Sequence, residues 1–539
     1  MISIQQIQLP ITHSDNELQE KIATILGLTS NEVKNFTITM RAIDSRKKRE
    51  MIYFIYTVTV DVNDENKVLK NESVLKKTKH HRIEIKEPYI YEIPEINSSK
   101  ISKRPIIVGS GPCGLFSALL LAKAGLKPIM IERGSDVDSR IKDVEAFIST
   151  GKLNTKSNIQ FGEGGAGTFS DGKLNTLITN PRIKYIFEEL VKAGAPNSIL
   201  WDAKPHIGTD KLRDVVKNIR KELIALGGEV RFNTELTDIK ITKNKLTGIV
   251  VNKDEEIETD TLILAIGYSA RDTYQMLFDK KLEIEQKAFS IGVRIEHKAD
   301  MIDKSQYDKF YNHEKLGRAK YKLVSHSDKN RSVYTFCMCP GGFVMPATAQ
   351  EDTIVTNGMS KYAQDGENSN SALLVNVNSK DFESDHPLAG IEFQKKWEEK
   401  TFKIGGKNYH APIQLVEDFL KKQKSTEIKS ITPTYKPGVT LASLDDCLPD
   451  FVTASLREAL PKLDNKIQGF AHPEAVLTAI ETRSSAPLRI VRDNETFQSN
   501  ISGIYPAGEG AGYAGGIVSS AVDGIRVSEA ILNEINNTL

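Results

Sequence analysis

Cysteine, long apolar runs and excess charge are all scarce in this sequence of 539 residues. The four cysteines are too few for a disulfide framework. No apolar run approaches the roughly 20 residues that cross a bilayer, and the first residues lack the basic start and apolar core of a signal peptide. The formal net charge is only +1, so charge favours neither nucleic acid nor an anionic membrane. These absences predict a cytoplasmic protein without a membrane span.

The remaining composition is that of an ordinary globular protein. Hydrophobic residues make up 39% of the chain and charged residues 27%. A chain of this length is too long for a single hydrophobic core, so two or three domains are expected.

The most informative stretch is IIVGSGPCGLFSALLLAKAGLKPIMIE, residues 106–132. Its pattern predicts a strand, a glycine turn, a helix, a second strand and an acid. Gly109 permits the sharp turn, Gly111 lets the backbone approach a pyrophosphate, and Gly114 lets the helix lie close to the sheet. The helix start adds free N–H groups that favour phosphate. We therefore predict a dinucleotide site that also includes the neighbouring Pro112 and Arg133.

Glu132 bears on which dinucleotide binds. It follows Gly111 by about the 20 residues expected of the acid that holds the ribose hydroxyls. A carboxylate there would repel a 2′-phosphate, which disfavours NADP. From these residues alone, NAD and FAD both remain possible.

Two further glycine-rich segments and one strand accompany this motif. FGEGGAGTFSDGK, residues 161–173, has small residues that let a backbone approach a flat or charged ligand, although a flexible surface loop would read similarly. An acid-led apolar strand over residues 260–267 ends in glycine, and the C-terminal segment 503–531 runs from a strand through Gly-Glu-Gly into a helix. The predicted cofactor contacts in these segments are Gly164, Gly165, Gly167, Gly267, Gly508, Glu509, Gly515, Gly516 and Ile517.

Together these motifs resemble the FAD-dependent oxidoreductases of the second glutathione-reductase type. More closely, the chain looks like a bacterial family of uncharacterised FAD-dependent (NAD/FAD-utilising) dehydrogenases. The closer resemblance rests on GSGPCG, FGEGGAGTFSDGKL, CMCPGGFV, HPEAVLTAIETRSSAPLRI and YPAGEGAGYAGGI, and it covers most of the chain from about Arg104 onward. Flavoproteins of the glutathione-reductase type usually have Asp where this chain has Glu509, a mild departure. The resemblance implies a redox role and FAD, whose site the C-terminal segment would complete, but no substrate.

The implied fold is α/β, with a discontinuous Rossmann-like FAD-binding domain, an inserted mixed α+β domain and a small N-terminal α/β module. We place the module at residues 1–95, the FAD-binding domain at 104–287 and 494–539, and the substrate or cap domain at 288–493. No histidine lies in the glycine-rich loops, which favours non-covalent FAD. No second complete G-x-G-x-x-G occurs, so electrons would come from transiently bound NADH or NADPH, from a protein donor or from the substrate.

The N-terminal module reads as β-α-β-β, with strands near 2–11, 33–42 and 51–62 and a helix near 16–28, an order that suggests a ferredoxin-like unit. Its turns are basic, around residues 41–49 and 76–82. A solvated surface of mixed charge is one interpretation. RNA binding is another, although no aromatic platform for bases is evident. Docking onto the FAD domain or onto a second copy is the third.

Cys337 and Cys339 form a C-x-C pair with three interpretations. A redox dithiol is one, although the spacing is tighter than C-x-x-C. A metal site would need a second pair of soft ligands, which the sequence lacks, so no metal is predicted. The third is a structural turn in which the cysteines are small apolar residues.

The candidate catalytic residues come from the run that precedes the last FAD strand. Arg483 could stabilise the reduced flavin or clamp a substrate carboxylate, and His472 could protonate the substrate. An interdomain salt-bridge network with a structural histidine is the alternative for both. Glu481, Arg489 and Arg294 are further polar candidates.

The first functional hypothesis is an FAD-dependent oxidoreductase that passes hydride through flavin N5 to or from a small organic substrate. The second is an FAD-dependent RNA-modifying protein that uses its basic module and a cysteine nucleophile. The third is a non-catalytic, flavin-binding regulatory protein. Near-neutral net charge weighs against the second, and the complete C-terminal motif weighs against the third.

Overall fold

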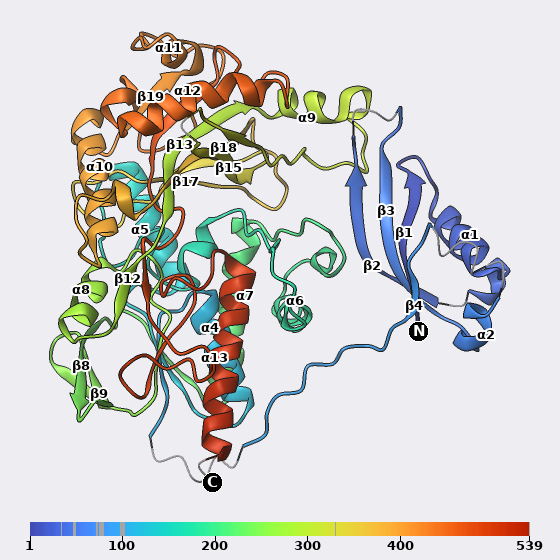
Figure 1. Ribbon diagram of the computed structural model, residues 1–539, viewed down its shortest axis with the longest axis horizontal. Coiled ribbons are helices and arrows are strands. Elements are labelled where there is room, and N and C mark those ends of the chain that lie inside the picture. The colour runs from blue at the N-terminus through green and yellow to red at the C-terminus, as the bar shows by residue number, and fades with distance from the viewer. Residues whose placement is uncertain are drawn as a thin grey trace.

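A computed structural model describes residues 1–33, 35–46, 50–71, 74, 80–96 and 103–537 of the chain. The chain forms an N-terminal module and a domain built on a parallel sheet, and a third domain is inserted into the chain of the parallel-sheet domain (Figure 1). Of the basic turns noted in the sequence, residues 47–49 and 76, 77 and 79 lie outside the described residues. Among those described, no helix is both long and apolar enough to cross a membrane.

The N-terminal module is a four-stranded antiparallel sheet in the order β2-β3-β1-β4. Its first helix starts where Ser14 and Glu17 cap each other and ends at Gly27, which is left-handed. This β-α-β-β-α-β order, with β3 between β1 and β2, is the split βαβ arrangement of ferredoxin-like modules. Its elements are β1 (Ile2–Pro10), α1 (Asp15–Leu26), β2 (Asn35–Asp44), β3 (Tyr53–Asp61), α2 (Glu65–Leu69) and β4 (Ile83–Ile85).

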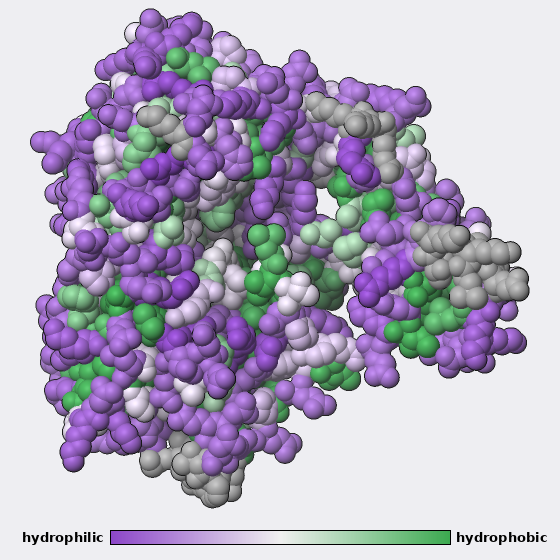
Figure 2. Space-filling view, viewed as in Figure 1, coloured by the Kyte–Doolittle hydropathy of each residue, from purple (hydrophilic) through white to green (hydrophobic). Residues whose placement is uncertain are grey.

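The module docks on the rest of the chain through the end of β2. The Arg41 N–H donates to the Trp201 carbonyl at 2.6 Å, and the Ala203 N–H donates to the Arg41 carbonyl at 3.0 Å. The Arg41 guanidinium lies 4.4 Å from the Trp201 ring and 4.9 Å from the Phe54 ring. The space-filling view shows an opening between the module and the rest of the chain (Figure 2).

The segment after β4 leaves the module and crosses to the parallel-sheet domain (Figure 1). There Tyr91 stacks on Tyr185 with ring centres 4.3 Å apart, and its hydroxyl donates to Glu529 at 2.7 Å. Part of the segment that the sequence assigns to the module therefore packs on the next domain.

The second domain is built on a parallel sheet in the order β23-β11-β5-β6-β7. Helices α4, α7 and α13 pack on one face, and a three-stranded antiparallel meander with α8 packs on the other. Its elements are β5 (Ile106–Val108), α4 (Pro112–Lys123), β6 (Ile129–Ile131), α5 (Val137–Thr150), α6 (Arg182–Lys192), α7 (Thr209–Ala225), β7 (Glu229–Arg231), the meander β8 (Leu236–Thr242), β9 (Lys245–Val251) and β10 (Glu255–Glu258), β11 (Leu262–Leu264), α8 (Arg271–Asp279), β23 (Ile504–Pro506) and α13 (Ile517–Asn537).

Helices α4 and α13 lie in close contact under the sheet because small residues face each other. A Cβ on Gly524 of α13 would collide with the Cys113 carbonyl of α4 and lie 2.7 Å from Ser117 Oγ. Helix α4 is apolar on nearly all sides and is correspondingly buried. Segments some 400 residues apart in sequence are thus locked together beneath the cofactor loops.

The inserted domain is a seven-stranded sheet in the order β14-β15-β18-β13-β21-β19-β20. Helix α12 packs on β14, β15 and β18, while α10 packs on β19 and β21. Its elements are β13 (Phe289–Lys298), α9 (Ala299–Tyr307), β14 (Val324–His326), β15 (Ser332–Cys339), β16 (Phe343–Pro346), β17 (Thr356–Met359), β18 (Asn368–Val377), α10 (Ala389–Gly405), β19 (Ala411–Leu415), α11 (Val416–Leu420), β20 (Val439–Leu441), α12 (Asp450–Asp464) and β21 (Val476–Glu481). The two domains are joined by a short ribbon of β12 (Ile284–Gln286) and β22 (Leu488–Ile490).

Candidate functional site

A cavity of 820 Å³ lies where the carboxyl ends of the parallel strands face the inserted domain. Such a crevice is where open α/β sheets bind ligands, and the volume is within the range of about 300–1,000 Å³ typical of ligand sites. Residues within the segments 108–113, 161–178, 265–273 and 507–520 line it from the parallel-sheet domain, and residues within 335–339, 357–358 and 481–484 line it from the inserted domain.

The first glycine turn lines this cavity as the sequence predicts. Gly109 has φ +101°, and a Cβ there would collide with the Ala265 carbonyl. Gly111, Pro112 and Cys113 line the cavity at the start of α4, so the N-terminal end of that helix opens into it. Gly114 does not line the cavity; a Cβ there would collide with the Gly109 carbonyl, so this glycine sets how closely helix and turn pack.

Glu132 lies in the cavity wall with its carboxylate fully engaged. One oxygen accepts the N–H groups of Gly134 and Gly162, both at 3.0 Å. The other accepts the N–H of Ser110 at 3.0 Å and its hydroxyl at 2.8 Å. A carboxylate offers about four acceptor positions, so a ribose hydroxyl would have to replace the Ser110 hydroxyl. Glu132 thus also ties three cofactor loops together.

The second glycine-rich loop lies directly against the first. A Cβ on Gly165 would be 3.0 Å from the Gly111 Cα, and both Gly165 and Gly167 face the cavity. Gly164 turns the chain behind them with φ +79° and does not line the cavity. Arg133 does line it, with its guanidinium 4.5 Å from the Phe161 ring and paired with Asp272 at 2.9 Å.

Arg140, on α5, holds this second loop from behind and was not predicted from the sequence. Its fully buried guanidinium donates to the carbonyls of Asn158 and Ile159, each at 2.8 Å, and of Glu163 at 2.6 Å. Burial lowers the pKa of Arg140 to about 10, so it remains charged at neutral pH. A Cβ on Gly162 would lie 2.5 Å from the Arg140 Cδ, so that glycine makes room for the guanidinium.

The C-terminal segment closes the cavity. Gly267, Glu509, Gly515, Gly516 and Ile517 line it, with α13 starting at Ile517. Gly508 lies behind, and its N–H donates to Asp523 at 2.7 Å. Arg492 donates to both oxygens of Asp523 and to the Pro506 carbonyl, which fixes strand β23 against the last helix.

Glu509 is a titratable group in this wall. Burial raises its pKa to about 7, opposed by the positive charge of Lys287. Burial also lowers the pKa of Lys287, and Arg489 adds to that effect. Both side chains line the cavity together with Tyr268, whose pKa is raised by burial and by the charge of Glu509.

Arg483 lines the cavity but is held in an ion-pair network. Glu398 lies between Arg271 and Arg483, with Nη–Oε distances of 2.9 and 3.0 Å. Although burial raises the pKa of Glu398, the two guanidinium groups lower it to about 2. Arg483 also donates to the Ser269 hydroxyl at 3.0 Å. The interdomain network proposed from the sequence is present, and Arg483 is the member of it that lines the cavity.

His472 does not lie in the cavity wall. It precedes β21, whose other end carries Glu481 into the cavity, and the strand's rise alone separates those ends by about 16 Å. Its Nδ1 accepts the N–H of Glu474 at 3.2 Å. This placement corrects the prediction that His472 protonates the substrate.

Cys337 and Cys339 lie where β15 bulges away from β18. Cys337 has φ +43°, a strained conformation that presents its thiol to the cavity. The surrounding protein raises the pKa of the Cys337 thiol to about 12 by desolvation, and burial also raises that of Cys339. Both are therefore neutral thiols, and the structure contains no disulfide between them.

Arg294 fixes this bulge from inside the inserted domain. Its fully buried guanidinium donates to the Cys337 carbonyl at 3.0 Å and pairs with Glu481 at 3.3 Å. A Cβ on Gly358 would collide with its Nη2. Arg489, the remaining candidate, pairs instead with Glu285 across the β12–β22 ribbon at 3.1 Å.

The arrangement fits a dinucleotide cofactor. Two helix starts, at Gly111 and at Ile517, open into one cavity, and Gly111, Gly515 and Gly516 present bare backbone there. A Cβ on Gly515 or Gly516 would meet nothing within 4 Å, so these positions leave open space where a ring system can lie. Phosphate groups suit the first helix start because of its free N–H groups and partial positive charge.

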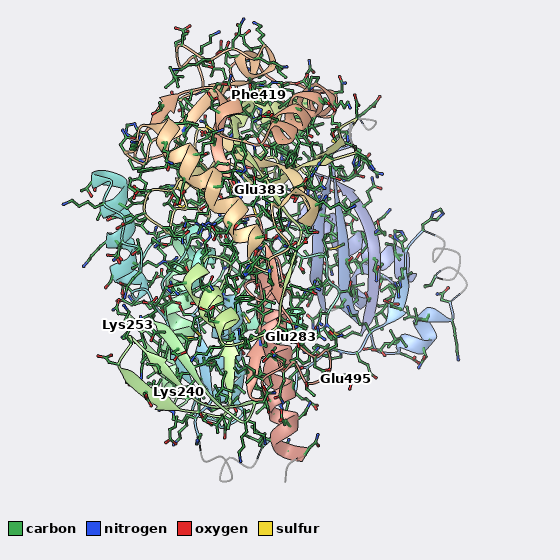
Figure 3. The ribbon with its side chains drawn as sticks, turned by 60° about the vertical axis from the view of Figure 1, so that its left-hand side comes forward. Lys240, Lys253, Glu283, Glu383, Phe419 and Glu495 are labelled. Carbon is green, nitrogen blue, oxygen red and sulfur yellow. The ribbon has the colours of Figure 1, made fainter. Side chains whose placement is uncertain are left out.

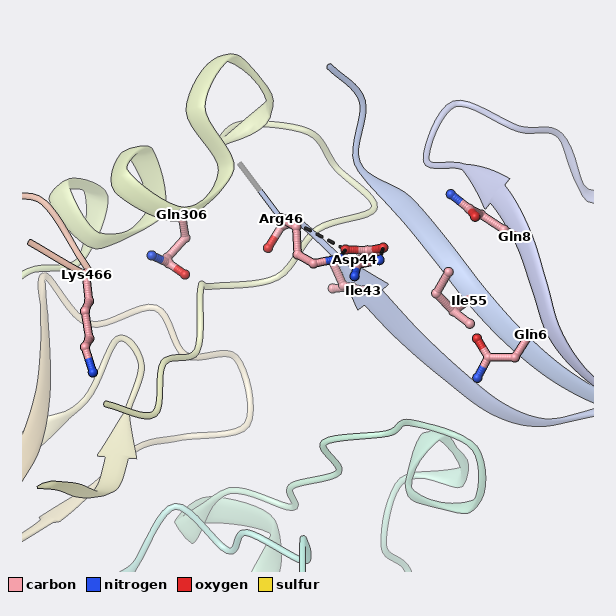
Figure 4. Close-up of a pocket in the computed structure, with 9 residues that line it drawn as sticks. Gln6, Gln8, Ile43, Asp44, Arg46, Ile55, Gln306 and Lys466 are labelled. Atoms are coloured by element: carbon pink, nitrogen blue, oxygen red, sulfur yellow. Dashed lines mark hydrogen bonds and ion pairs between the residues drawn. The ribbon is translucent and has the colours of Figure 1, made fainter. Parts of the chain in front are cut away.

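A second, polar groove of 570 Å³ lies between the module and α9 (Figure 4). It is lined by Gln6, Gln8 and Gln306 among others, and its Asp44 and Arg46 pair with each other at 2.6 Å. It is open and has no convergent set of buried charges. Within the described part of the chain, no group of His, Cys, Asp or Glu could hold a metal ion.

Three family models match the chain. A model described as "FAD-dependent protein, C-terminal domain-like" matches residues 288–484, an FAD binding domain matches residues 104–142, and a domain of unknown function matches residues 1–61. An uncharacterised protein of Clostridium beijerinckii is 47% identical over 541 residues, which cover 99% of this chain and 99% of the relative.

Solved structures resemble the chain more distantly. Halogenase PltM in complex with phloroglucinol and FAD is 12% identical with a TM-score of 0.38, over 81% of this chain and 71% of that one. The L-proline dehydrogenase from P. horikoshii is 13% identical with a TM-score of 0.34, over 80% of this chain and 94% of that one. At these scores the likeness says nothing about the chemistry of this chain.

Proposed function

We propose, from the premise that this chain belongs to an uncharacterised family of FAD-dependent proteins, that it oxidises or reduces a small organic molecule held between its cofactor and the inserted domain. FAD is the cofactor, and when bound it supplies the electron transfer. The observation that carries the proposal is that one cavity has glycine-rich loops on one side and polar side chains of the inserted domain on the other.

The residues divide the cofactor's binding among three places. The start of α4 at Gly111 would hold the pyrophosphate, and Glu132 the ribose once the Ser110 hydroxyl turns away. Gly515, Gly516 and Ile517 would lie under the flavin ring. This division follows the layout of the second glutathione-reductase type, which is part of the proposal.

Glu509 is the residue that we expect to exchange a proton in this site. Its pKa of about 7 lets the carboxyl group be protonated or ionised near neutral pH. Lys287 in the same wall favours the ionised form, so its positive charge would stabilise the Glu509 carboxylate after the proton leaves. These two side chains replace His472 as the proton-handling group of the proposal.

Arg483 would act as a fixed donor. Its contacts with Glu398 and Ser269 hold the guanidinium in one place without reorganisation, which is how a site stabilises charge that develops during reaction. Glu481, held by Arg294, and the Cys337 thiol complete the wall that would face the substrate. The electron source in this proposal is transiently bound NADH or NADPH, a protein donor or, when the substrate is oxidised, the substrate itself.

Anaerobic absorbance tests this function. The FAD-loaded protein is mixed in turn with NADH and NADPH, and the reduced sample with a panel of small organic oxidants. We expect one nucleotide to bleach the flavin band and one class of oxidant to restore it. A flavin that both nucleotides and a matching panel of organic reductants leave oxidised would make FAD a structural group and overturn the proposal.

A further inference from the structure

The cavity has a positively charged end that the proposed cofactor contacts do not use. Four lysines line it, from three separate segments of the chain; we call them the lysine cluster. They are Lys173, Lys204, Lys320 and Lys322. In the segments that supply these lysines, residues 171–178, 204 and 320–322, Asp171 is the one carboxylate that lines the cavity, so this end carries a net positive charge.

Backbone pairing holds two of these segments together. The Leu174 N–H donates to the Pro205 carbonyl at 2.9 Å, and the Ile207 N–H donates to the Gly172 carbonyl at 3.1 Å. This antiparallel contact places the Lys173 and Lys204 positions on one rigid strip. The backbone of the cluster is therefore part of the cavity wall, although the Lys204 and Lys322 side chains are themselves exposed.

Lys320 is tied to the same strip. Its Nζ donates to the carbonyl of Lys204 at 3.0 Å. Burial lowers the pKa of Lys320, Asp202 and Asp171 oppose that effect, and the positive charges of Lys173 and Lys204 add to it. An ammonium group kept in such surroundings is destabilised until a negative charge arrives.

Asp171 cannot compensate the cluster alone. It is only 3% exposed, and its Oδ1 accepts the Ser360 hydroxyl. Its Oδ2 lies 3.6 Å from Lys173 Nζ but has no hydrogen-bond partner among the described residues. Asp171 and Asp202 are thus two carboxylates near four lysines, so the positive charge of this end is only partly compensated.

The cluster meets the wall that would face the substrate. Lys173 Nζ lies 4.0 Å from the Cys339 sulfur, which Arg294 also contacts at 3.7 Å. Cys337 lies two residues away on the same bulge and faces the cavity. A molecule bound at the lysines would therefore extend along β15 toward the region of Cys337 and Glu481.

We propose that the lysine cluster, oriented by Asp171, binds an anionic group of the substrate, a carboxylate or a phosphate, so that the enzyme acts on small organic anions. This inference rests on the proposed function, because it places the anion in the cavity that holds FAD. A lysine ammonium group acts as a point charge and so binds a compact oxyanion from many directions. Arginine, in contrast, favours anions that match its planar guanidinium group.

The test measures anion binding to the FAD-loaded protein. Malonate and inorganic phosphate are titrated at constant ionic strength, and the flavin absorbance shift and the melting temperature are recorded for each. FAD content is measured in every sample. We expect at least one of the two anions to saturate the spectral shift, and which one does so distinguishes a carboxylate from a phosphate substrate.

Variants locate the binding. The double change Lys173→Gln and Lys320→Gln should weaken anion binding at least tenfold. Lys204→Gln should weaken anion binding several-fold, and because the Lys204 side chain is exposed, its loss should not unfold the chain. Lys253→Gln serves as the control, because Figure 3 places Lys253 in the meander region and it does not line the cavity. It should bind as the unchanged protein does.

The outcomes separate this inference from the proposed function. A protein that holds FAD but shows no saturable effect of either anion, or whose double variant binds as tightly as Lys253→Gln, overturns the anion site alone. Failure to hold FAD overturns the function itself. Loss of reduction by the nicotinamide nucleotide in the double variant, with anion binding retained, would assign the lysines to the nucleotide and contradict the proposal.

Discussion

Replacing Arg140 by methionine removes the side chain that holds the second glycine-rich loop against the cofactor cavity. The guanidinium donates to the carbonyls of Asn158, Ile159 and Glu163 at 2.6–2.8 Å, all inside the protein. Methionine keeps an unbranched side chain of similar length, so the change removes the donors and the charge with little loss of packing.

The size of the effect follows from those bonds. A hydrogen bond from a charged group contributes about 1.5–3 kcal/mol, and a buried carbonyl left without a donor costs about 1–3 kcal/mol. Removing a guanidinium that burial destabilises offsets part of this loss. We expect a net loss of about 3 kcal/mol. Because the loop lies directly against Gly111, that loss should appear as about a hundredfold weaker FAD binding.

Fluorescence titration of FAD into the deflavinated variant measures this, and Arg213→Met is the matched control. Arg213 stacks on the same Phe169 ring as Arg140, at 5.2 Å against 4.8 Å, but its Nε finds no hydrogen-bond partner among the described residues. Arg213→Met should bind FAD within about threefold of the unchanged protein, since the Nε that it removes makes no hydrogen bond to the described residues. Equal FAD affinity for the two variants would refute the reasoning.

Three other predictions follow from the same structure. Gly358→Ala forces a Cβ into the Arg294 guanidinium and should lower the free energy of unfolding by about 1–3 kcal/mol. Gly317→Ala is the control, because its Cβ would meet open space and should leave stability unchanged. Equal melting temperatures for the two variants would contradict the expected collision. Burial raises the pKa of Glu509 from 4.5 to about 7, so the folded FAD-free chain binds that proton more tightly and loses stability as pH rises between these values. Glu509→Gln should flatten the dependence of the denaturant midpoint on pH. The same pH profile for the variant and the unchanged protein would contradict this role of Glu509. Arg41→Ala removes a cation held between two aromatic rings, worth about 0.5–2 kcal/mol, and should speed proteolysis in the segment after the module; an unchanged cleavage rate would show that the backbone contacts suffice.

The cofactor loops could be predicted from the sequence because their chemistry is local. Gly109 and Gly111 act through their own backbone conformation and the helix that follows, so the six positions of the motif, 109–114, define the turn. Parts of the module were harder. Strand β4, at Ile83–Ile85, has three residues and gains its order from pairing with β1, so no local alternation marks it.

The rest of the site depends on contacts between distant segments. Arg140 sits on an ordinary amphipathic helix, and nothing in its local pattern shows that it turns toward a loop about 20 residues later. His472 and Arg483 are close in sequence, yet strand β21 carries them to opposite ends because an extended strand rises about 3.3 Å per residue. Lys173 was visible at the end of a glycine-rich motif, but its companion Lys320 lies in a segment without any motif.

FAD content tests the central claim most directly. The protein is purified, its flavin released by denaturation and quantified, and the deflavinated chain titrated with FAD and with FMN. The account predicts one FAD per chain, saturable rebinding of FAD and much weaker binding of FMN, because the Gly111 turn and Glu132 are built for the nucleotide half that FMN lacks. A chain that carries no flavin and takes up neither compound, or that prefers FMN, would contradict it.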